Sequence, residues 1–129
     1  MLNTIISMCA IQYGLHYGIE PNLIKAIAKV ESHNRPYAIS PDGHDIGLMQ
    51  VRKTYVDETV EQLLDTCTSI KVGARILKFN KKNCKHKKDY TFIVCYNVGV
   101  TGGNKITKPK KFIYYKKVMK YMRKEVVYR

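Results

Sequence analysis

Residues 20–32 read Glu-Pro-Asn-Leu-Ile-Lys-Ala-Ile-Ala-Lys-Val-Glu-Ser, and this stretch predicts an amphipathic helix that ends near a carboxylate. Pro21 suits the first turn of a helix. A carboxyl group at the end of such a helix, close to the core, is partly desolvated, which raises its pKa and keeps it protonated near neutrality. Glu31 is therefore a candidate general acid, although a lone Glu at a helix end is more often a solvated side chain. The core-facing stripe of this helix recurs at helical spacing and consists of Leu23, Ile24, Ile27, Ala28 and Val30.

The rest of the chain alternates helical patterns with polar stretches that contain Gly and Pro. Residues 33–50 hold Pro36, Pro41, Gly43 and Gly47, and are expected to be irregular with a short β-hairpin. Asp89 suits the N-cap of a helix from Tyr90 to about Asn97, after which residues 98–103 are expected to form a loop. Further helices are expected over residues 4–17, 57–65, 68–80 and 110–128. The prediction is a mainly α fold with a small irregular or hairpin segment between helices.

The length of 129 residues suits a single domain, 1–129. No stretch approaches the ~18 apolar residues that a membrane-spanning helix needs. Residues 1–8 are too short for a complete signal peptide and lack its basic start. We therefore expect that a signal segment is absent or was removed.

The net charge is +13, from 23 Lys and Arg against 10 Asp and Glu. Such a charge indicates either a preference for polyanions or a Lys-rich solvated surface, and the total alone names no partner. The sequence contains no paired zinc ligands, no aromatic RNA-binding signature and no clear helix-turn-helix, so no specific nucleic acid is predicted as a partner. It also lacks a phosphate-binding loop, and no cofactor is expected.

The four cysteines are Cys9, Cys67, Cys84 and Cys95. No two lie at the spacing of a zinc ribbon or a thioredoxin-like redox pair. Three full pairings are possible and spacing does not choose among them; four reduced thiols in a cytosolic protein are the alternative. In an oxidising compartment, a bridge between Cys9 and Cys67 would close a long loop and stabilise the fold by about 4 kcal/mol in the chain-entropy model.

Two more runs carry side chains suited to a sugar ligand: Gly47-Leu48-Met49-Gln50 and Tyr96-Asn97-Val98-Gly99. The amides of Gln50 and Asn97 both donate and accept hydrogen bonds, as sugar hydroxyls and acetamido groups require. Tyr96 offers a flat stacking face and one hydroxyl. Met49 is a further candidate, although a Met in such a run more often packs beneath a site than contacts a ligand.

The order and spacing of these motifs resemble the goose-lysozyme-like lytic transglycosylases, in their soluble Slt-type catalytic domain. The family pattern runs through Glu-Ser, Gly-Leu-Met-Gln, an Ala-Gly-x-x-Leu-like helix and Ala-Tyr-Asn-x-Gly, and it closes with Tyr-x-x-x-Val. The corresponding residues here are 31–32, 47–50, 73–77, 95–99 and 114–118. The resemblance covers roughly Cys9 to Arg123 and implies a lysozyme-like fold and an enzyme that cleaves peptidoglycan.

The resemblance also implies roles for individual residues. Glu31 would protonate the glycosidic oxygen between N-acetylmuramic acid (MurNAc) and N-acetylglucosamine (GlcNAc), then act as base toward the MurNAc C6 hydroxyl, leaving a 1,6-anhydro end. Ser32 would orient the Glu31 carboxylate, and Tyr114 would contact Glu31 or line its pocket. The sugar would be held by Gln50, Tyr96 and Asn97.

A narrower resemblance is to the small transglycosylases of type III secretion, conjugation and pilus systems. Their pattern shares Cys9, an Asp-x-Cys-x-x-Ile run at 65–70 and an Asp-Ile-Gly-Leu-Met-Gln run at 45–50. It implies a disulfide between Cys9 and Cys67, a periplasmic or secreted setting, a monomer, and assembly proteins of a secretion, conjugation or phage system as partners. Cys84 has no counterpart in the pattern and Cys95 stands where Ala is usual, so both are expected to be free thiols.

Asp45 leaves two alternatives open. It could face Glu31 as the second carboxylate of a hydrolytic lysozyme, or it could close the turn formed by residues 41–43. His33 and His44 flank the expected site, but their spacing does not require a metal, and none is predicted. A catalytically silent glycan-binding or structural component of a secretion apparatus or virion is the alternative from another functional class.

Overall fold

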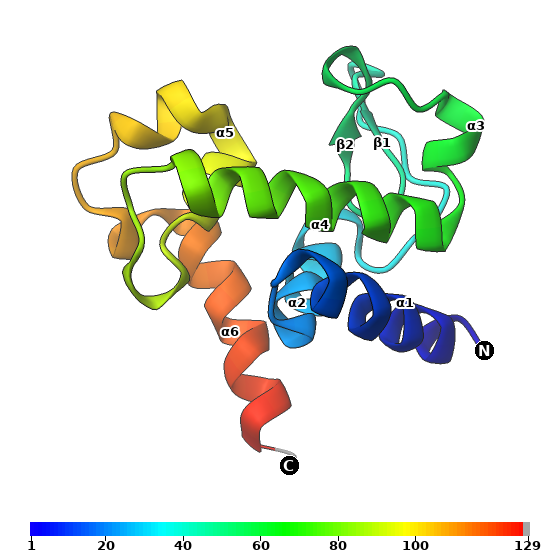
Figure 1. Cartoon of the computed structure of the whole chain (residues 1–129), viewed down its shortest axis with the longest axis horizontal. Coiled ribbons are helices and arrows are strands. Elements are labelled where there is room, and N and C mark those ends of the chain that lie inside the picture. The colour runs from blue at the N-terminus through cyan, green and yellow to red at the C-terminus, as the bar shows by residue number, and fades with distance from the viewer. Residues whose placement is uncertain (128–129) are drawn as a thin grey trace.

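We describe a computed structural model of the chain, which covers the backbone of residues 1–127 and the side chains of residues 1–123. The described part is mainly helical with one small hairpin, as predicted, and its arrangement is that of a lysozyme-like fold (Figure 1). The α-helices are α1 (Leu2–Tyr17), α2 (Pro21–Ser32), α3 (Val60–Leu63), α4 (Thr66–Asn83), α5 (Ile93–Asn104) and α6 (Ile113–Val127), and the strands are β1 (Asp45–Ile46) and β2 (Val51–Arg52). Single 3-10 turns cover Lys53–Tyr55, Lys88–Tyr90 and Pro109–Lys111.

The chain reverses sharply between α1 and α2. Gly18 ends α1 with a φ of 70°, a left-handed conformation that glycine adopts at low cost. Pro21 then opens α2, because a first-turn residue needs no N–H donor. The sequence therefore sets the α1–α2 corner that presents Glu31 at the far end of α2.

The hairpin is shorter than most and lies where the irregular segment was predicted, although its second strand falls just past residue 50. Strands β1 and β2 are antiparallel, with Asp45 opposite Arg52 and Ile46 opposite Val51. The turn before β1 is closed by Asp42, whose Oδ1 accepts from the Ser40 hydroxyl at 2.6 Å and the His44 amide at 3.0 Å. The side chain of Asp45 therefore does not close this turn, but its backbone does: the Ser40 amide donates to the Asp45 carbonyl at 2.9 Å, and the Asp45 amide donates to Ser40 Oγ at 3.0 Å.

Helix α4 spans the molecule between the hairpin and α5 (Figure 1). Asp65 caps its N-terminus by accepting from the Thr68 amide at 2.9 Å. The predicted disulfide between Cys9 and Cys67 is present and joins α1 to the start of α4. None of the helices in the described part is long and apolar enough to cross a membrane.

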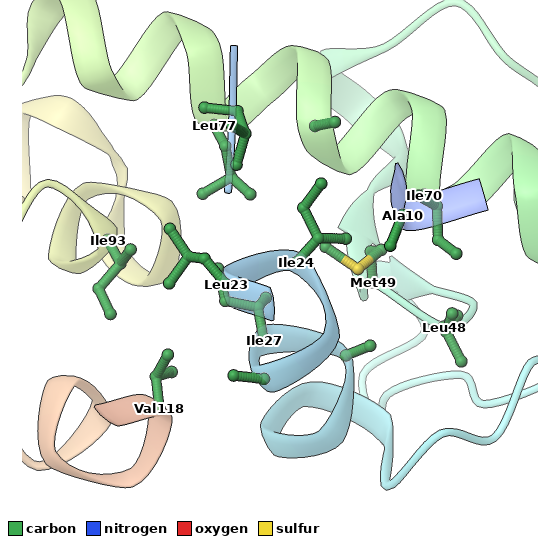
Figure 2. Close-up of a cluster of buried hydrophobic side chains, with 14 of the residues drawn as sticks. Ala10, Leu23, Ile24, Ile27, Leu48, Met49, Ile70, Leu77, Ile93 and Val118 are labelled. Carbon is green, nitrogen blue, oxygen red and sulfur yellow. The ribbon is translucent and has the colours of Figure 1, made fainter. Parts of the chain in front are cut away.

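The core lies between α4 and α2, with contributions from every other long helix and from the Gly47–Gln50 run. Figure 2 shows Leu23, Ile24 and Ile27 of α2 at its centre, with Ile93 and Val118 at one end and Leu48, Met49 and Ile70 at the other. Leu23, Ile24 and Ile27 are completely buried. Burial of one such side chain contributes about 1.5–3 kcal/mol, so the core fixes α2 firmly.

Two predictions for residues 84–104 are wrong. The helix begins at Ile93, not Tyr90, and Asp89 is no N-cap: its backbone is left-handed (φ 55°) and its carboxylate pairs with Lys110. The helix also continues through residues 98–103, where a loop was expected. Gly99 interrupts it with a φ of 81°, after which helical turns resume to Asn104.

Cys84 and Cys95 form a second disulfide, so the expectation of two free thiols is also wrong. Their Cα atoms lie 6.1 Å apart, because the end of α4 returns against the start of α5. The bridge ties down the Lys-rich segment between the two helices. In the chain-entropy model a loop of this size contributes about 3 kcal/mol.

The last helix was predicted over 110–128 and is observed over Ile113–Val127, since Pro109–Lys111 forms a separate 3-10 turn. Tyr128 lies outside the described residues. Helix α6 packs its apolar face, which includes Tyr114, Val118 and Met122, against α2 and α5. The packing of α6 on α2 brings Tyr114 to Glu31.

Candidate active site

Glu31 is the penultimate residue of α2 and faces α6. The Tyr114 hydroxyl donates to Glu31 Oε2 at 2.8 Å. Tyr114 is only 8% exposed, whereas Glu31 is half-buried, so one side of the carboxyl group is held by the protein and the other is open to a ligand. The prediction that Tyr114 contacts Glu31 agrees with this geometry.

The environment of Glu31 raises its pKa from 4.5 to about 7. Loss of solvation on burial is the main cause, and the negative charge of Asp45 raises the pKa further. The hydrogen bond from Tyr114 acts in the opposite direction, because it stabilises the carboxylate. Glu31 also stands in the last turn of α2, where the helix dipole disfavours a negative charge. The carboxyl group is thus about half protonated at neutral pH.

The Gly47–Gln50 run forms a tight turn that is fixed by two helices. The Met49 amide donates to the buried Ser69 Oγ of α4 at 3.0 Å, and the Met49 carbonyl accepts from the Tyr96 hydroxyl of α5 at 2.7 Å. Gly47 has a φ of 81°, and a Cβ there would collide with the Leu63 carbonyl oxygen. This turn is therefore a rigid platform, and only glycine fits at its first position.

Tyr96 lies close to both carboxylates. Burial raises its pKa well above the usual value, and the charges of Glu31 and Asp45 raise it further. Its hydroxyl is engaged by the Met49 carbonyl, so the polar end is held inside the protein. Its ring is the part of Tyr96 that remains for contact with a sugar.

Gln50 and Asn97 differ in how they are held. The Gln50 amide nitrogen donates to the carbonyls of Ala38 at 3.1 Å and Gly47 at 3.0 Å, which ties the loop before β1 to the tight turn. These two hydrogen bonds fix the side chain through its nitrogen, and the Gln50 amide oxygen remains as an acceptor for a ligand. Asn97 is exposed on α5 beside Tyr96.

Asp45 is paired, not isolated. Arg52 across the hairpin donates to it through Nε at 3.1 Å and through Nη2 at 3.4 Å. The Asp45 amide donates to Ser40 Oγ at 3.0 Å, so its backbone is fixed as well. Asp45 is near enough to influence the pKa of Glu31, but its carboxylate oxygens are directed to a guanidinium group.

One predicted contact differs in the structure, that of Ser32, and the packing of Met49 beneath the site is as expected. The buried Ser32 hydroxyl donates to the Ala28 carbonyl one turn earlier at 3.1 Å and not to the Glu31 carboxylate, because it points back along α2. The Met49 side chain is fully buried against Gly73 of α4, where an added Cβ would lie 2.8 Å from Met49 Cε. Only the backbone of Met49 supports the site.

Sequence reasoning missed Ser69 and Arg52. Ser69 is completely buried within the apolar stripe of α4, and a polar residue inside such a stripe is a signal that could have indicated its role. Arg52 could not be paired with Asp45 from the sequence, since the pairing depends on the register of the hairpin.

The transglycosylase SLT domain family matches residues 8–118, a segment that contains every residue of the site described above. A peptidoglycan-binding-like protein of Escherichia coli O157:H7 is 32% identical over 129 aligned residues, which cover 87% of this chain and 74% of that protein. The invasion protein IagB of Salmonella typhimurium strain SL1344 is 38% identical over 86 residues, 59% of this chain and 54% of IagB. IagB of Salmonella typhi matches to the same extent. The matched segment is thus about half of IagB.

Proposed function

The chain belongs to the transglycosylase SLT domain family, and from this premise we propose that it cleaves the MurNAc-β-1,4-GlcNAc bond of peptidoglycan with Glu31 as general acid and base. The family consists of peptidoglycan lytic transglycosylases, so the chain is an enzyme of this class acting on peptidoglycan. The proposal concerns the catalytic residue, the product and the setting.

The observation that carries the proposal is the geometry of Glu31, a half-buried carboxyl group with one fixed hydrogen-bond donor, the Tyr114 hydroxyl at 2.8 Å; its burial raises the pKa to about 7. A carboxylic acid that is largely neutral at pH 6–7 can donate its proton to the glycosidic oxygen as the bond to MurNAc C1 breaks. The GlcNAc fragment then leaves as a neutral alcohol. The Tyr114 hydroxyl stays hydrogen-bonded to the carboxylate that forms and stabilises it.

The second step follows from the same carboxylate. The MurNAc C6 hydroxyl attacks C1, its proton passes to Glu31, and the acid is restored while a 1,6-anhydro end forms. The acetamido group of the substrate stabilises the positive charge that develops at C1, so a second protein carboxylate is not required. The ion pair between Asp45 and Arg52 favours this route over a hydrolytic one, because the Asp45 carboxylate is engaged by Arg52 and not by a substrate as its nucleophile.

The neighbouring side chains are proposed to position the sugars. The Gln50 amide oxygen accepts from a sugar hydroxyl or acetamido N–H, and the exposed amide of Asn97 binds the next polar group. The ring of Tyr96 supports one face of a sugar. The turn of residues 47–50, fixed by Ser69 and Tyr96, holds Gln50 in place.

The setting is proposed to be periplasmic or secreted, with the enzyme acting as a monomer in the service of an envelope-spanning machine or a phage particle. Two disulfides fit an extracytoplasmic location, since such bonds persist in oxidising compartments. The similarity to the invasion protein IagB supports the association with such a machine.

Digestion of purified sacculi in water enriched in oxygen-18, followed by mass spectrometry of the muropeptides, tests the proposal. Transfer to the C6 hydroxyl yields anhydro ends that carry no oxygen-18, and Glu31→Gln yields no product above background. Reducing ends that carry one oxygen-18 would show hydrolysis and reject the transglycosylase route. Release of muropeptides by Glu31→Gln at the wild-type rate would reject Glu31 as the acid.

A further inference from the structure

The charge of this protein is divided unequally along the chain. Residues 1–65 contain five Lys and Arg against eight Asp and Glu, a net charge of −3, whereas residues 66–129 contain 18 against two, a net charge of +16. The boundary falls at the start of α4, so α4, α5, α6 and their connections carry the positive charge, and the hairpin and α3 do not (Figure 1). Glu31 and Asp45 both belong to the acidic half.

Helix α6 concentrates this charge on one face. Residues 113, 116, 117 and 120 follow the i, i+3, i+4, i+7 spacing of a single helix face. They are Ile113, Lys116, Lys117 and Lys120, all exposed, and we call them the basic face of α6. The buried face of α6, which includes Tyr114, Val118 and Met122, packs inward and Tyr114 reaches Glu31, so the basic face lies on the solvent side of the helix that completes the active site.

The composition of the basic face distinguishes among polyanions. Ile113 is 70% exposed although it stands between Lys111 and Lys116, an arrangement in which an apolar side chain gains free energy only by entering an apolar phase. In residues 66–123 lysine greatly outnumbers arginine, and one of the two arginines, Arg75, is paired with Glu58. Lysine is a hydrated point charge that suits diffuse attraction to a charged surface, whereas recognition of nucleic-acid bases favours the arginine fork.

A lipid surface meets both requirements at once. Lysines beside an anionic bilayer are attracted to its headgroups, and an apolar side chain among them inserts at the boundary with the acyl chains. Lys110 contributes less, because it pairs with Asp89. The lysines of the basic face have no acidic partner among the hydrogen bonds and ion pairs of residues 1–123.

We propose that the basic face of α6 docks the enzyme on a membrane of anionic phospholipid, with Ile113 entering the interface and the three lysines contacting headgroups. Tyr114 is buried with its hydroxyl on Glu31, whereas the basic face is exposed, so docking uses none of the residues of the active site. The surface thus places the active site close to a bilayer.

Co-sedimentation of the protein with vesicles tests the proposal. We expect binding to phosphatidylcholine vesicles that contain about one third phosphatidylglycerol, and little binding to pure phosphatidylcholine. Raising the salt from about 50 mM to about 500 mM should release the protein, since the attraction is screened. The triple variant Lys116→Gln, Lys117→Gln, Lys120→Gln should lose affinity by at least about tenfold, and Ile113→Ser by a smaller factor. Digestion of lipid-free sacculi should not change in any of these variants.

A matched variant removes the same charge elsewhere in the basic half: Lys71→Gln, Lys78→Gln, Lys85→Gln, three exposed lysines of α4 and the segment after it. It should retain most of the vesicle binding. Equal losses in the two triple variants would overturn the assignment to α6. Wild-type binding that ignores phosphatidylglycerol, or that is stronger for duplex DNA than for the anionic vesicles at the same salt, would overturn the choice of a membrane.

Discussion

The contact between α2 and α6 carries Glu31, and the β1–β2 hairpin carries Asp45. Both carboxylates lie close to the same neighbour, Tyr96, but their own surroundings differ. At the helix contact, Glu31 is half-buried beside a tyrosine hydroxyl, and its pKa rises to about 7. In the hairpin, Asp45 faces the guanidinium of Arg52 across two paired strands. Burial is the main cause of the raised pKa of Glu31, which makes it a candidate acid, whereas the oxygens of Asp45 are engaged by Arg52.

Removal of the acid should have the largest effect. We expect Glu31→Gln to lower kcat/KM on peptidoglycan by about 10²–10⁴-fold, the usual contribution of a general acid. The matched control is Glu61→Gln, which changes an exposed glutamate on α3 and should leave the rate unchanged. Similar losses in both variants would mean that charge, not proton transfer at Glu31, limits the reaction.

The same substitution should stabilise the protein at high pH. The pKa of Glu31 is about 7 in the folded state against 4.5 for an ordinary glutamate, so the folded state binds the proton more tightly. The free energy of unfolding therefore falls as pH rises from 4.5 through 7, by an amount on the order of 3 kcal/mol. Glu31→Gln has no such charge to bury.

Thermal unfolding measured at pH 5 and pH 8 checks this expectation. The variant should melt above the wild type at pH 8 and close to it at pH 5, where Glu31 is neutral in the folded protein. A wild-type stability that does not fall between these pH values would contradict the burial of an ionisable Glu31.

Tyr114→Phe should have the next largest effect. Loss of the hydrogen bond at 2.8 Å removes what lowers the pKa of Glu31, so the pKa should rise above about 7 and the alkaline limb of kcat/KM should move to higher pH. The lost hydrogen bond to a charged group costs about 1.5–3 kcal/mol in the carboxylate state, which slows the step in which Glu31 is ionised. Tyr115→Phe is the matched control, because its hydroxyl donates to the Asp89 carbonyl and not to Glu31.

Substitutions in the hairpin should give the smallest shifts in the pH dependence of kcat/KM, and the shifts caused by the two substitutions should have opposite signs. Asp45→Asn removes a negative charge that raises the pKa of Glu31, so the alkaline limb should move to lower pH. Arg52→Gln leaves Asp45 without its counter-charge and should move the limb to higher pH. Both shifts should be smaller than that of Tyr114→Phe, since the pair is partly exposed and solvent screens it. A loss in Asp45→Asn as large as in Glu31→Gln would restore Asp45 as a second catalytic carboxylate.

The sequence predicted the helical half of this comparison better than the hairpin half. The apolar periodicity of residues 20–32 predicted helix α2 and the position of Glu31 near its end, because buried positions recur with every turn of an amphipathic helix. The pairing of Asp45 with Arg52 depends on strand register, and a two-residue strand carries no periodic signal. The Ser32 contact was missed for a similar reason, since a rotamer decides between the Ala28 carbonyl and the Glu31 carboxylate.

The region around α5 shows another limit. Gly99, Gly102 and Gly103 predicted a loop from composition, but the helix resumes after Gly99, and Gly103 packs so closely on Cys95 that any Cβ would collide with its sulfur. The disulfide between Cys84 and Cys95 depends on the same tertiary contact. Neither feature is written in local propensity, because both arise where the end of α4 meets α5.

The proton affinity of Glu31 is the central claim, and titration of its side-chain carboxyl carbon by NMR measures it directly. Protein labelled with carbon-13 at glutamate, with Glu31→Gln used to assign the resonance, should show a midpoint near pH 7 that coincides with the alkaline fall of kcat/KM. A midpoint near 4.5, the ordinary pKa of a glutamate, would mean that Glu31 is ionised at neutral pH and would contradict its role as the acid.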